Sequence, residues 1–295
     1  MIALFYFGMF CCNCLTVFSG RKYAKNTQTL NDLAIFNLIT GIMATAIFYV
    51  TSGFKIQLNT RTLIYALIFA LVIFINNTLS VAVFKYMGVA ESIFIRQGLS
   101  LTVSISMGVL LYKEKFTLVS FLQIALIFLT FLAIFLPTLK NKTTVKTITF
   151  TGLVICILTS VLSPFCTVIT KSFAIDTEVT DETSFFFMTN VFMILTALTL
   201  VITLNKGSIN NSLKSFKTVP TAEYFTIFLN VFASNMGSLL SMAILKKDAL
   251  LLYVPLSNAL YLLAGETVSI FIAKEKPKII AMILALLSIL VVLFF

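Results

Sequence analysis

Long apolar stretches of about 20 residues follow one another along the whole chain, separated by short polar segments. A helix needs roughly 20 apolar residues to cross the hydrocarbon core of a bilayer, so each stretch is a candidate transmembrane helix. The predicted spans are 2–20, 32–52, 62–85, 89–112, 117–137, 149–172, 183–204, 221–245, 248–272 and 277–295. We therefore expect an all-α integral membrane protein with ten transmembrane helices.

The composition excludes a soluble fold. Of the 295 residues, 59% are hydrophobic and 11% are charged, whereas about 25% of the residues in soluble domains are charged. The net charge of +10 lies almost wholly in the short segments between the spans, as expected next to a lipid bilayer. A nucleic-acid partner is not expected, because the chain has no basic stripe and no soluble domain to carry one.

The His and Cys content excludes several kinds of catalytic and metal site. The chain has no His, which excludes His-based general-base catalysis, haem ligation by His and His-containing zinc motifs. Its five cysteines lie within the spans, and the pattern C-C-x-C at Cys11, Cys12 and Cys14 lacks the spaced pairs of a zinc site. We expect no cofactor, no metal site and no catalytic residue, so the chain is not expected to be an enzyme.

A repeat links two parts of the chain at a shift of 161 residues. The segment S-V-A-V-F-K-Y at 80–86 aligns with S-M-A-I-L-K-K at 241–247. The same shift places K-E-K at 113–115 on K-E-K at 274–276. Charged landmarks that stay in register are a stronger sign of a repeat than matches among apolar residues.

The repeat predicts two units of five helices, at 1–137 and 149–295, joined by a connecting loop at 138–148. Because five is an odd number, the second unit enters the membrane from the side opposite to the first. Such inverted repeats are typical of secondary transporters, in which the substrate binds near the middle of the membrane between the halves. The alternative is the vague similarity that any polytopic chain shows between its halves.

The repeat contains the motifs of a known family. The span 89–112 ends in L-L-Y-K-E-K-F-T, and the span 248–272 is followed by the second K-E-K. With five plus five helices, the chain resembles the EamA-type drug/metabolite transporter superfamily (DMT), in which a small residue and then a Glu commonly close these two spans. The sequence departs from the pattern at Lys113 and Lys274, where a Gly is common, and has Pro255 in the second span but no proline in the first.

The resemblance implies a transporter fold in which these two spans line a central cavity. It also implies that both chain termini lie in the cytoplasm. The charge distribution predicts the opposite orientation, because the loops on the side away from the termini carry 13 Lys and Arg against 7 on the side of the termini, and the side with more positive loops is usually cytoplasmic. Membrane orientation therefore stays open.

Arg96 and Glu266 are the most deeply placed charges and lie on the two spans that correspond in the repeat. Each is about seven residues from the same membrane surface, so at 1.5 Å rise per residue both are predicted roughly 10 Å inside it. We expect them to form an ion pair. It is either a gated pair for which a substrate or a proton competes, or a permanent salt bridge that fixes the packing.

Amide side chains form a second group of candidates. Gln97 and Asn258 are counterparts in the repeat, and further amides occur at Asn76 and Asn77 in one span and at Asn235 in its repeat partner. Such groups can bind the hydroxyl, amine or carbonyl groups of a substrate, or they can hold helices together by hydrogen bonds.

We expect no role in substrate binding for several charged residues near the ends of the spans. Glu114 and Glu275 of the K-E-K turns are expected to be solvated, and Lys171 is expected to extend to the membrane surface. For the acidic residues Asp176, Glu178, Asp181 and Glu182 a solvated loop is expected, with cation binding as the alternative.

These features predict a secondary transporter of a small organic metabolite or drug that works by alternating access. No Walker-type phosphate loop is present, so energy is expected from coupling to a proton or to a counter-substrate. The alternatives are a lipid flippase and, less favoured, an integral-membrane enzyme. The expected partners are the lipid bilayer and a small-molecule substrate, and the chain is a monomer or a homodimer. Abundant Phe, Lys and Asn without Trp is typical of an AT-rich genome. The membrane of this multi-pass protein is then a bacterial plasma membrane, which we favour, or an organellar membrane.

Overall fold

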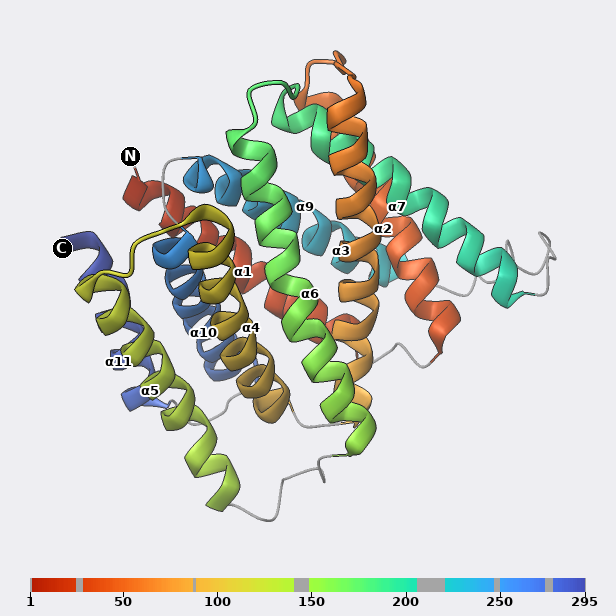
Figure 1. Cartoon of the computed structure of the whole chain (residues 1–295). Helices are drawn as coiled ribbons and strands as arrows, with labels where there is room; N and C mark the ends of the chain where they lie inside the picture. Colours follow the sequence, from red (N-terminus) through yellow and green to blue (C-terminus); the bar gives the residue numbers. More distant parts are fainter. Residues whose placement is uncertain are drawn as a thin grey trace.

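The computed structural model describes residues 2–24, 29–86, 89–140, 149–205, 221–246, 250–273 and 278–294. Within these residues the secondary structure is helical, without a β-strand (Figure 1). The helices are α1 (Ile2–Ala24), α2 (Leu30–Thr51), α3 (Thr60–Tyr86), α4 (Val89–Tyr112), α5 (Leu118–Lys140), α6 (Phe150–Ile175), α7 (Glu182–Leu204), α9 (Thr221–Leu245), α10 (Leu250–Ala273) and α11 (Ile279–Phe294). The prediction of an all-α chain is confirmed.

Several helices are long and apolar enough to cross a membrane. In the part of the chain that the structure describes, five meet this criterion of length and composition: Leu30–Thr51, Thr60–Ser80, Phe150–Ile175, Glu182–Leu204 and Glu223–Leu245. Shorter apolar helices run over Leu4–Ser19, Leu118–Thr130 and Ile279–Val291. These helices are compatible with a multi-pass membrane protein, while the count of ten spans and the inverted repeat stay predictions.

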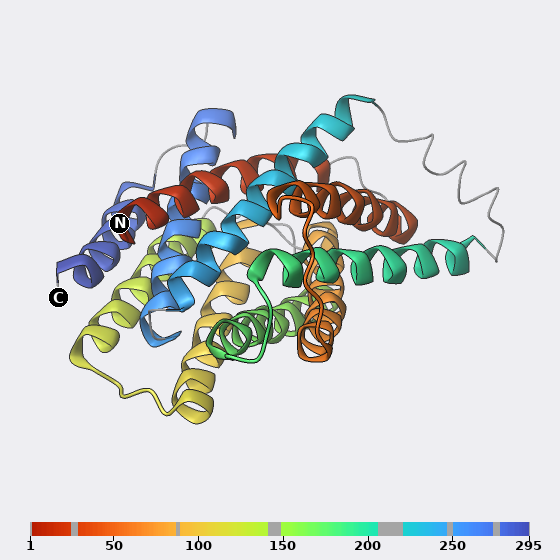
Figure 2. The same ribbon diagram turned by 90° about the horizontal axis from the view of Figure 1, so that it is seen from above.

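The helices form one bundle with a tightly packed pair at each of two opposite edges. The helices α5 and α11 pack against each other at one edge, and α2 and α7 do so at the other (Figures 1 and 2). Between them, α1 packs on α9 and α10, while α6 packs on α3 and α4. Both ends of the described chain lie near the α5–α11 edge.

The outer surface of the bundle is apolar. Large hydrophobic side chains are exposed on many helices, among them Phe7, Leu110, Phe150, Phe271 and Ile280. Soluble monomers rarely expose continuous apolar surface of this extent, whereas lipid tails cover it without loss of free energy. The outer surface therefore agrees with the apolar composition.

The connecting segments 52–59, 113–117 and 176–181 lie at one end of the bundle, which we call the loop end (Figure 1). There Arg61 Nη1 is 3.2 Å from Asp176 Oδ1 and 2.6 Å from Glu178 Oε2. The hydroxyl oxygens of Thr62 and Thr180 are 3.0 Å apart. These contacts join the start of α3 to the segment between α6 and α7, so part of the acidic loop is bound to the protein rather than only to solvent.

Glu114 and Lys171 form a buried ion pair, also close to the loop end. Glu114 Oε1 is 2.5 Å from Lys171 Nζ, and the two side chains are 10% and 9% exposed. Glu114 Oε1 also accepts a hydrogen bond from Leu250 N at the start of α10, and Lys171 Nζ lies 4.8 Å from the centre of the Tyr112 ring. The predictions of a solvated Glu114 and of a Lys171 that extends to the membrane surface are wrong. The reason is that the turn after α4 folds inward between α6 and α10.

Five phenylalanines pack together beneath the loop end: Phe48, Phe69, Phe173, Phe185 and Phe186. The rings of Phe173 and Phe185 stack with their centres 4.3 Å apart, and those of Phe48 and Phe186 with their centres 5.3 Å apart. These residues come from α2, α3, α6 and α7. We call them the aromatic cluster.

Candidate functional site

A cavity of about 450 Å³ lies between the helices of the bundle. Its described lining comes from α1, α2, α3, α4, α6, α7, α9 and α10, while α5 and α11 contribute none of these residues. Phe69 and Phe186 of the aromatic cluster belong to the wall, so the cluster lies between the cavity and the loop end. A volume of this size is within the range of small-molecule sites, ~300–1,000 Å³.

The cavity wall is rich in polar residues, unlike the outer surface. Its polar residues are Asn13, Thr16, Thr40, Asn76, Asn77, Ser80, Arg96, Gln97, Ser100, Ser104, Ser163, Thr167, Thr189, Asn190, Asn230, Ser234, Asn235, Ser238, Tyr253, Ser257, Asn258 and Tyr261. Among the described lining residues, Arg96 is the single one with a formal charge. A membrane protein gains nothing by placing so many polar groups in a wall unless they face water, each other or a ligand.

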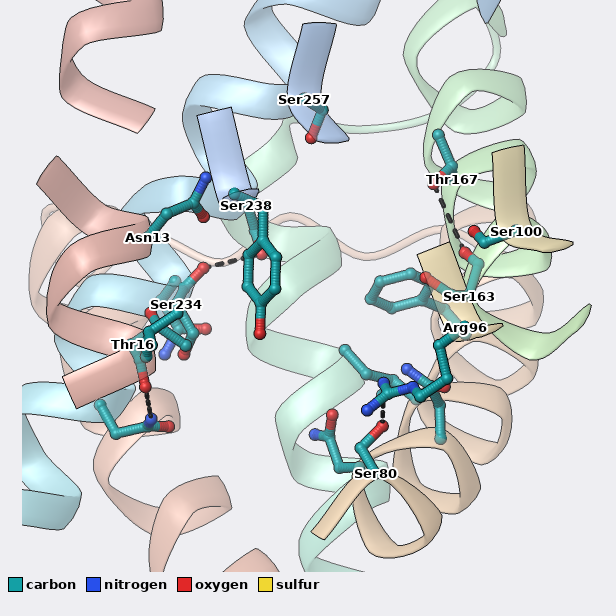
Figure 3. A pocket seen from close by; sticks show the side chains of 18 of the residues that line it. Asn13, Thr16, Ser80, Arg96, Ser100, Ser163, Thr167, Ser234, Ser238 and Ser257 are labelled. Atoms are coloured by element: carbon teal, nitrogen blue, oxygen red, sulfur yellow. Dashed lines mark hydrogen bonds between the residues drawn. The ribbon is translucent and has the colours of Figure 1, made fainter. Parts of the chain in front are cut away.

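Arg96 projects from the third turn of α4 toward the end of α3 (Figure 3). Its Nη2 donates a hydrogen bond of 2.7 Å to Ser80 Oγ. Tyr261 of α10 and Cys156 of α6 lie near the guanidinium. The guanidinium thus donates to a neutral hydroxyl, and no carboxylate among the described residues forms an ion pair with it.

Glu266 does not pair with Arg96. Its Oε1 lies 3.4 Å from Lys278 Nζ at the start of α11, with side chains 11% and 28% exposed, and Glu266 is not among the cavity-lining residues. The two helices do place both charges near the same end, but depth along a helix does not fix rotation about its axis. Each residue turns the side chain by about 100°, and α10 presents Asn258 and Tyr261 to the cavity while Glu266 faces α11.

The other predicted site residues are brought together around the cavity. These are Arg96, Gln97, Asn76, Asn77, Asn235 and Asn258, which all belong to its lining. Asn235 Nδ2 donates a hydrogen bond of 2.8 Å to Val231 O in its own helix. Most of the cavity's hydroxyl groups were missed by sequence reasoning.

A spacing signal could have found these hydroxyl groups. Polar residues recur every four positions on one face of several apolar helices: Arg96, Ser100 and Ser104 in α4; Ser163 and Thr167 in α6; Asn230, Ser234 and Ser238 in α9; and Tyr253, Ser257 and Tyr261 in α10. Residues four apart lie on the same face of a helix. Each stripe therefore marks the face that looks into the bundle.

Many hydroxyl groups of the wall are held by their own helix. Ser238 Oγ donates to Ser234 O at 2.9 Å, Ser234 Oγ to Val231 O at 3.1 Å, and Thr167 Oγ1 to Ser163 O at 3.4 Å. A hydroxyl that has donated its proton in this way keeps lone pairs that accept further hydrogen bonds. Such groups therefore offer acceptors to a ligand.

Four wall residues carry a buried polar atom without a hydrogen-bond partner among the described residues. The atoms are Thr40 Oγ1, Asn76 Oδ1, Thr189 Oγ1 and Asn258 Nδ2. An unsatisfied buried polar group costs about 1–3 kcal/mol. The wall thus has hydrogen-bonding capacity that its own packing does not use.

Ligand binding is the chemistry that the wall supports. No group of three His, Cys, Asp or Glu side chains that could hold a metal ion occurs within the described residues. The polar groups are amides, hydroxyls and one guanidinium, which bind but do not readily exchange protons near pH 7.

Comparisons with known proteins bear on the fold alone. No family model and no curated protein matches the sequence. Among solved structures 28 chains match, and one of them, titled "Crystal structure of protein", superposes with a TM-score of 0.67 at 13% sequence identity. The match covers 98% of this chain and 95% of the other. The chain therefore shares its overall helical arrangement with a protein known from a crystal structure.

Proposed function

We propose that this protein is a secondary transporter of small organic solutes, with the cavity as its substrate site. The observation that carries the proposal is the contrast between a polar cavity with a single formal charge in its described lining and an apolar outer surface. A protein that only anchors or scaffolds has no use for such a cavity, whereas a carrier must give a polar solute a polar surface inside the membrane.

The helix contacts support the proposed division of the chain into two inverted halves. Taken in chain order within each proposed half, α1 to α5 correspond to α6, α7, α9, α10 and α11, and the shift of 161 residues places the starts of α3, α4 and α5 on those of α9, α10 and α11. The packing of α1 on α9 then has its counterpart in that of α6 on α3, and the packing of α1 on α10 in that of α6 on α4. The pairs α2–α7 and α5–α11 map onto themselves. This is the pattern expected of a two-fold axis between the halves.

The loop end supports alternating access because its contacts join the proposed halves. Besides Arg61 and Thr62, Asn59 Nδ2 in the first half donates a hydrogen bond of 2.7 Å to Glu178 O in the second, and Gln57 N donates one of 3.0 Å to Ser184 Oγ. For a solute to leave the cavity at this end, these contacts and the aromatic cluster would have to separate. The described conformation is therefore proposed to be closed at the loop end.

The proposal is tested by reconstituting the protein in liposomes and exposing them to a metabolite extract. We expect at least one small polar metabolite to accumulate, by mass spectrometry, above the level in protein-free liposomes. A fluorescent-lipid scrambling assay on the same liposomes should show no acceleration, which separates the proposal from a flippase. Absence of any accumulated metabolite, with lipid movement accelerated instead, would refute it.

A further inference from the structure

The charge inside the cavity has no compensating acid among the described residues. Arg96 is the charged group of the described lining, it donates a hydrogen bond to the neutral Ser80 hydroxyl, and Glu266 is paired with Lys278 outside the cavity. A guanidinium stays protonated throughout the pH range of living cells. Removing such a cation from bulk water is costly unless an anion is close. The positive charge of Arg96 therefore favours an anionic ligand in the cavity.

We propose that the cavity binds a small organic anion, a carboxylate or a phosphate ester, that also carries hydroxyl or amide groups. This inference rests on the proposed function and names the class of its substrate. Planar guanidinium groups bind carboxylate and phosphate oxygens through two parallel hydrogen bonds. Arg96 uses Nη2 on Ser80, and other N–H groups of the guanidinium are available to the anion.

The opposite wall suits the neutral part of such a molecule. Figure 3 shows Asn13 and Thr16 of α1 with Ser234 and Ser238 of α9 across the cavity from Arg96. The hydroxyls of Ser234 and Ser238 are already donated to backbone oxygens, so they accept hydrogen bonds from ligand hydroxyl or amide groups. A molecule that spans the cavity thus places its anion at Arg96 and its hydrogen-bond donors at α1 and α9.

The same arrangement disfavours cationic, zwitterionic and neutral ligands. A cation would approach Arg96 without a described carboxylate in the lining to offset the repulsion. A zwitterion such as an amino acid would find a partner for its carboxylate but none with opposite charge for its ammonium group. Neutral solutes would leave the guanidinium without a counter-ion.

The test compares ligands that share a shape and differ in charge. Glucuronate, glucose and glucosamine have the same ring and carry a negative, no and a positive charge. The pairs glycerate with glycerol, and glycerol phosphate with glycerol, extend the series and distinguish a carboxylate from a phosphate. Binding to the purified full-length protein is measured by thermal shift and by calorimetry at one fixed salt concentration, since a ligand of the folded state raises its stability.

We expect stabilisation by anionic members of the series and none by their neutral or cationic counterparts. Arg96→Gln should weaken the binding of the anion by tenfold or more, roughly the loss of a hydrogen bond to a charged group, and Arg96→Lys should weaken it less. Arg61→Gln is the matched control, because it removes an arginine at the loop end and should leave the dissociation constant within about twofold.

The outcomes separate the two proposals. Stabilisation by neutral or cationic members, or anion binding that survives in a folded Arg96→Gln protein, overturns the anion inference and leaves the transporter proposal standing. Arg96→Lys serves where Arg96→Gln fails to fold, and equal anion binding by it and by the unaltered protein counts against a bidentate contact. If no member binds and no metabolite accumulates in liposomes, the transporter proposal itself is refuted.

Discussion

At the scale of single residues, burial decides which charges matter for stability. The ion pair between Arg61 and Glu178 has side chains 52% and 71% exposed, and exposed pairs contribute about 0–1 kcal/mol. The pair between Glu114 and Lys171 is nine-tenths buried. Removing one member of such a pair leaves a charge that water cannot reach.

Glu114→Gln is therefore expected to destabilise the protein by about 3–5 kcal/mol, because Lys171 would keep its charge in a buried place. Glu178→Gln is the matched control and is expected to cost less than about 1 kcal/mol. Apparent free energies of unfolding from denaturation of the purified protein in detergent provide the measurement. Similar losses of unfolding free energy in both variants would show that the buried Glu114–Lys171 pair stabilises the protein no more than the exposed Arg61–Glu178 pair does.

The sequence predicted which residues would surround the cavity better than it predicted how they pair. Arg96 and the amides stand out because polar groups are rare in apolar spans, and six of them line one cavity: Asn76, Asn77, Arg96, Gln97, Asn235 and Asn258. The pairing of Glu266 could not be predicted from its depth, because a difference of a few residues rotates a side chain to another neighbour. Glu114 was misjudged because a K-E-K turn looks the same whether it is solvated or folded inward.

At the scale of helices, Gly41 allows α2 and α7 to approach closely. A Cβ atom at this position would lie 2.8 Å from Ile194 Cγ1 and 3.4 Å from Asn190 O, which belong to α7. The first distance is well inside van der Waals contact, and the second involves backbone that cannot easily move. Close approach of helices at small residues is a common source of packing energy in membranes.

Gly41→Ala is expected to destabilise the protein by about 1–3 kcal/mol, the usual cost of overpacking. Gly265→Ala is the control on α10, since no atom outside its local backbone lies within 4 Å of its added Cβ, and there a gain of up to about 1 kcal/mol is expected from helix propensity. The two variants are compared by unfolding in detergent. A neutral Gly41→Ala would indicate that α2 and α7 can separate at no cost.

Helix α7 starts on a capping residue whose charge responds to pH. Asp181 accepts hydrogen bonds from Ser184 N at 2.8 Å, from Ser184 Oγ at 2.7 Å and from the Thr183 hydroxyl. Partial burial alone would raise the pKa of the Asp181 carboxyl above its ordinary 3.8, but these hydrogen bonds outweigh it and the pKa is lowered.

Because the pKa of Asp181 is lower in the folded than in the unfolded protein, the ionised cap stabilises the fold fully above about pH 4 and loses this effect as the pH falls through the folded pKa. Thermal melts between pH 2 and 6 should therefore show a steeper acid loss for the unaltered protein than for Asp181→Asn, which caps without titrating. Asp181→Ala is expected to cost about 1 kcal/mol at neutral pH. Identical acid profiles for the unaltered protein and Asp181→Asn would contradict this role.

Over the whole molecule, the proposed mechanism requires the loop end to separate. The hydroxyls of Thr62 and Thr180 lie 3.0 Å apart across the two proposed halves, so cysteines at these positions are expected to be close enough to form a disulfide. In a background where the five native cysteines are replaced, the Thr62→Cys, Thr180→Cys protein is expected to lose transport on oxidation and to regain it on reduction. Metabolite uptake by liposomes is the measurement.

The cross-linked protein should still bind its ligand, because the cavity is formed in the conformation that the cross-link holds. The Thr62→Cys protein, oxidised in the same way, is the control, because it shows any loss of uptake that comes from oxidation of a single thiol without a cross-link. Full uptake by a protein shown by mass spectrometry to be cross-linked would rule out opening at the loop end.

The helices could be located from the sequence because long apolar segments alternate with short polar ones. Each described helix overlaps a predicted span, for example α4 (Val89–Tyr112) on 89–112 and α9 (Thr221–Leu245) on 221–245. The packing of helix on helix could not be predicted, because nearly every face of such a helix is apolar. The cavity depends on that packing, so its residues were predicted as candidates and its shape was not.

The charge of Arg96, which has no carboxylate partner among the described residues, also has an electrical consequence. A unit charge that moves through the whole membrane potential changes its energy by about 2.3 kcal/mol per 100 mV. On the proposed mechanism the empty carrier holds a positive charge at Arg96, whereas a carrier loaded with a singly charged carboxylate is neutral there. Membrane voltage would then shift the conformational equilibrium of the empty protein and leave that of the loaded protein nearly unchanged. Voltage would therefore change the rate at which the empty protein reorients, and not the rate at which the loaded protein carries its substrate across the membrane.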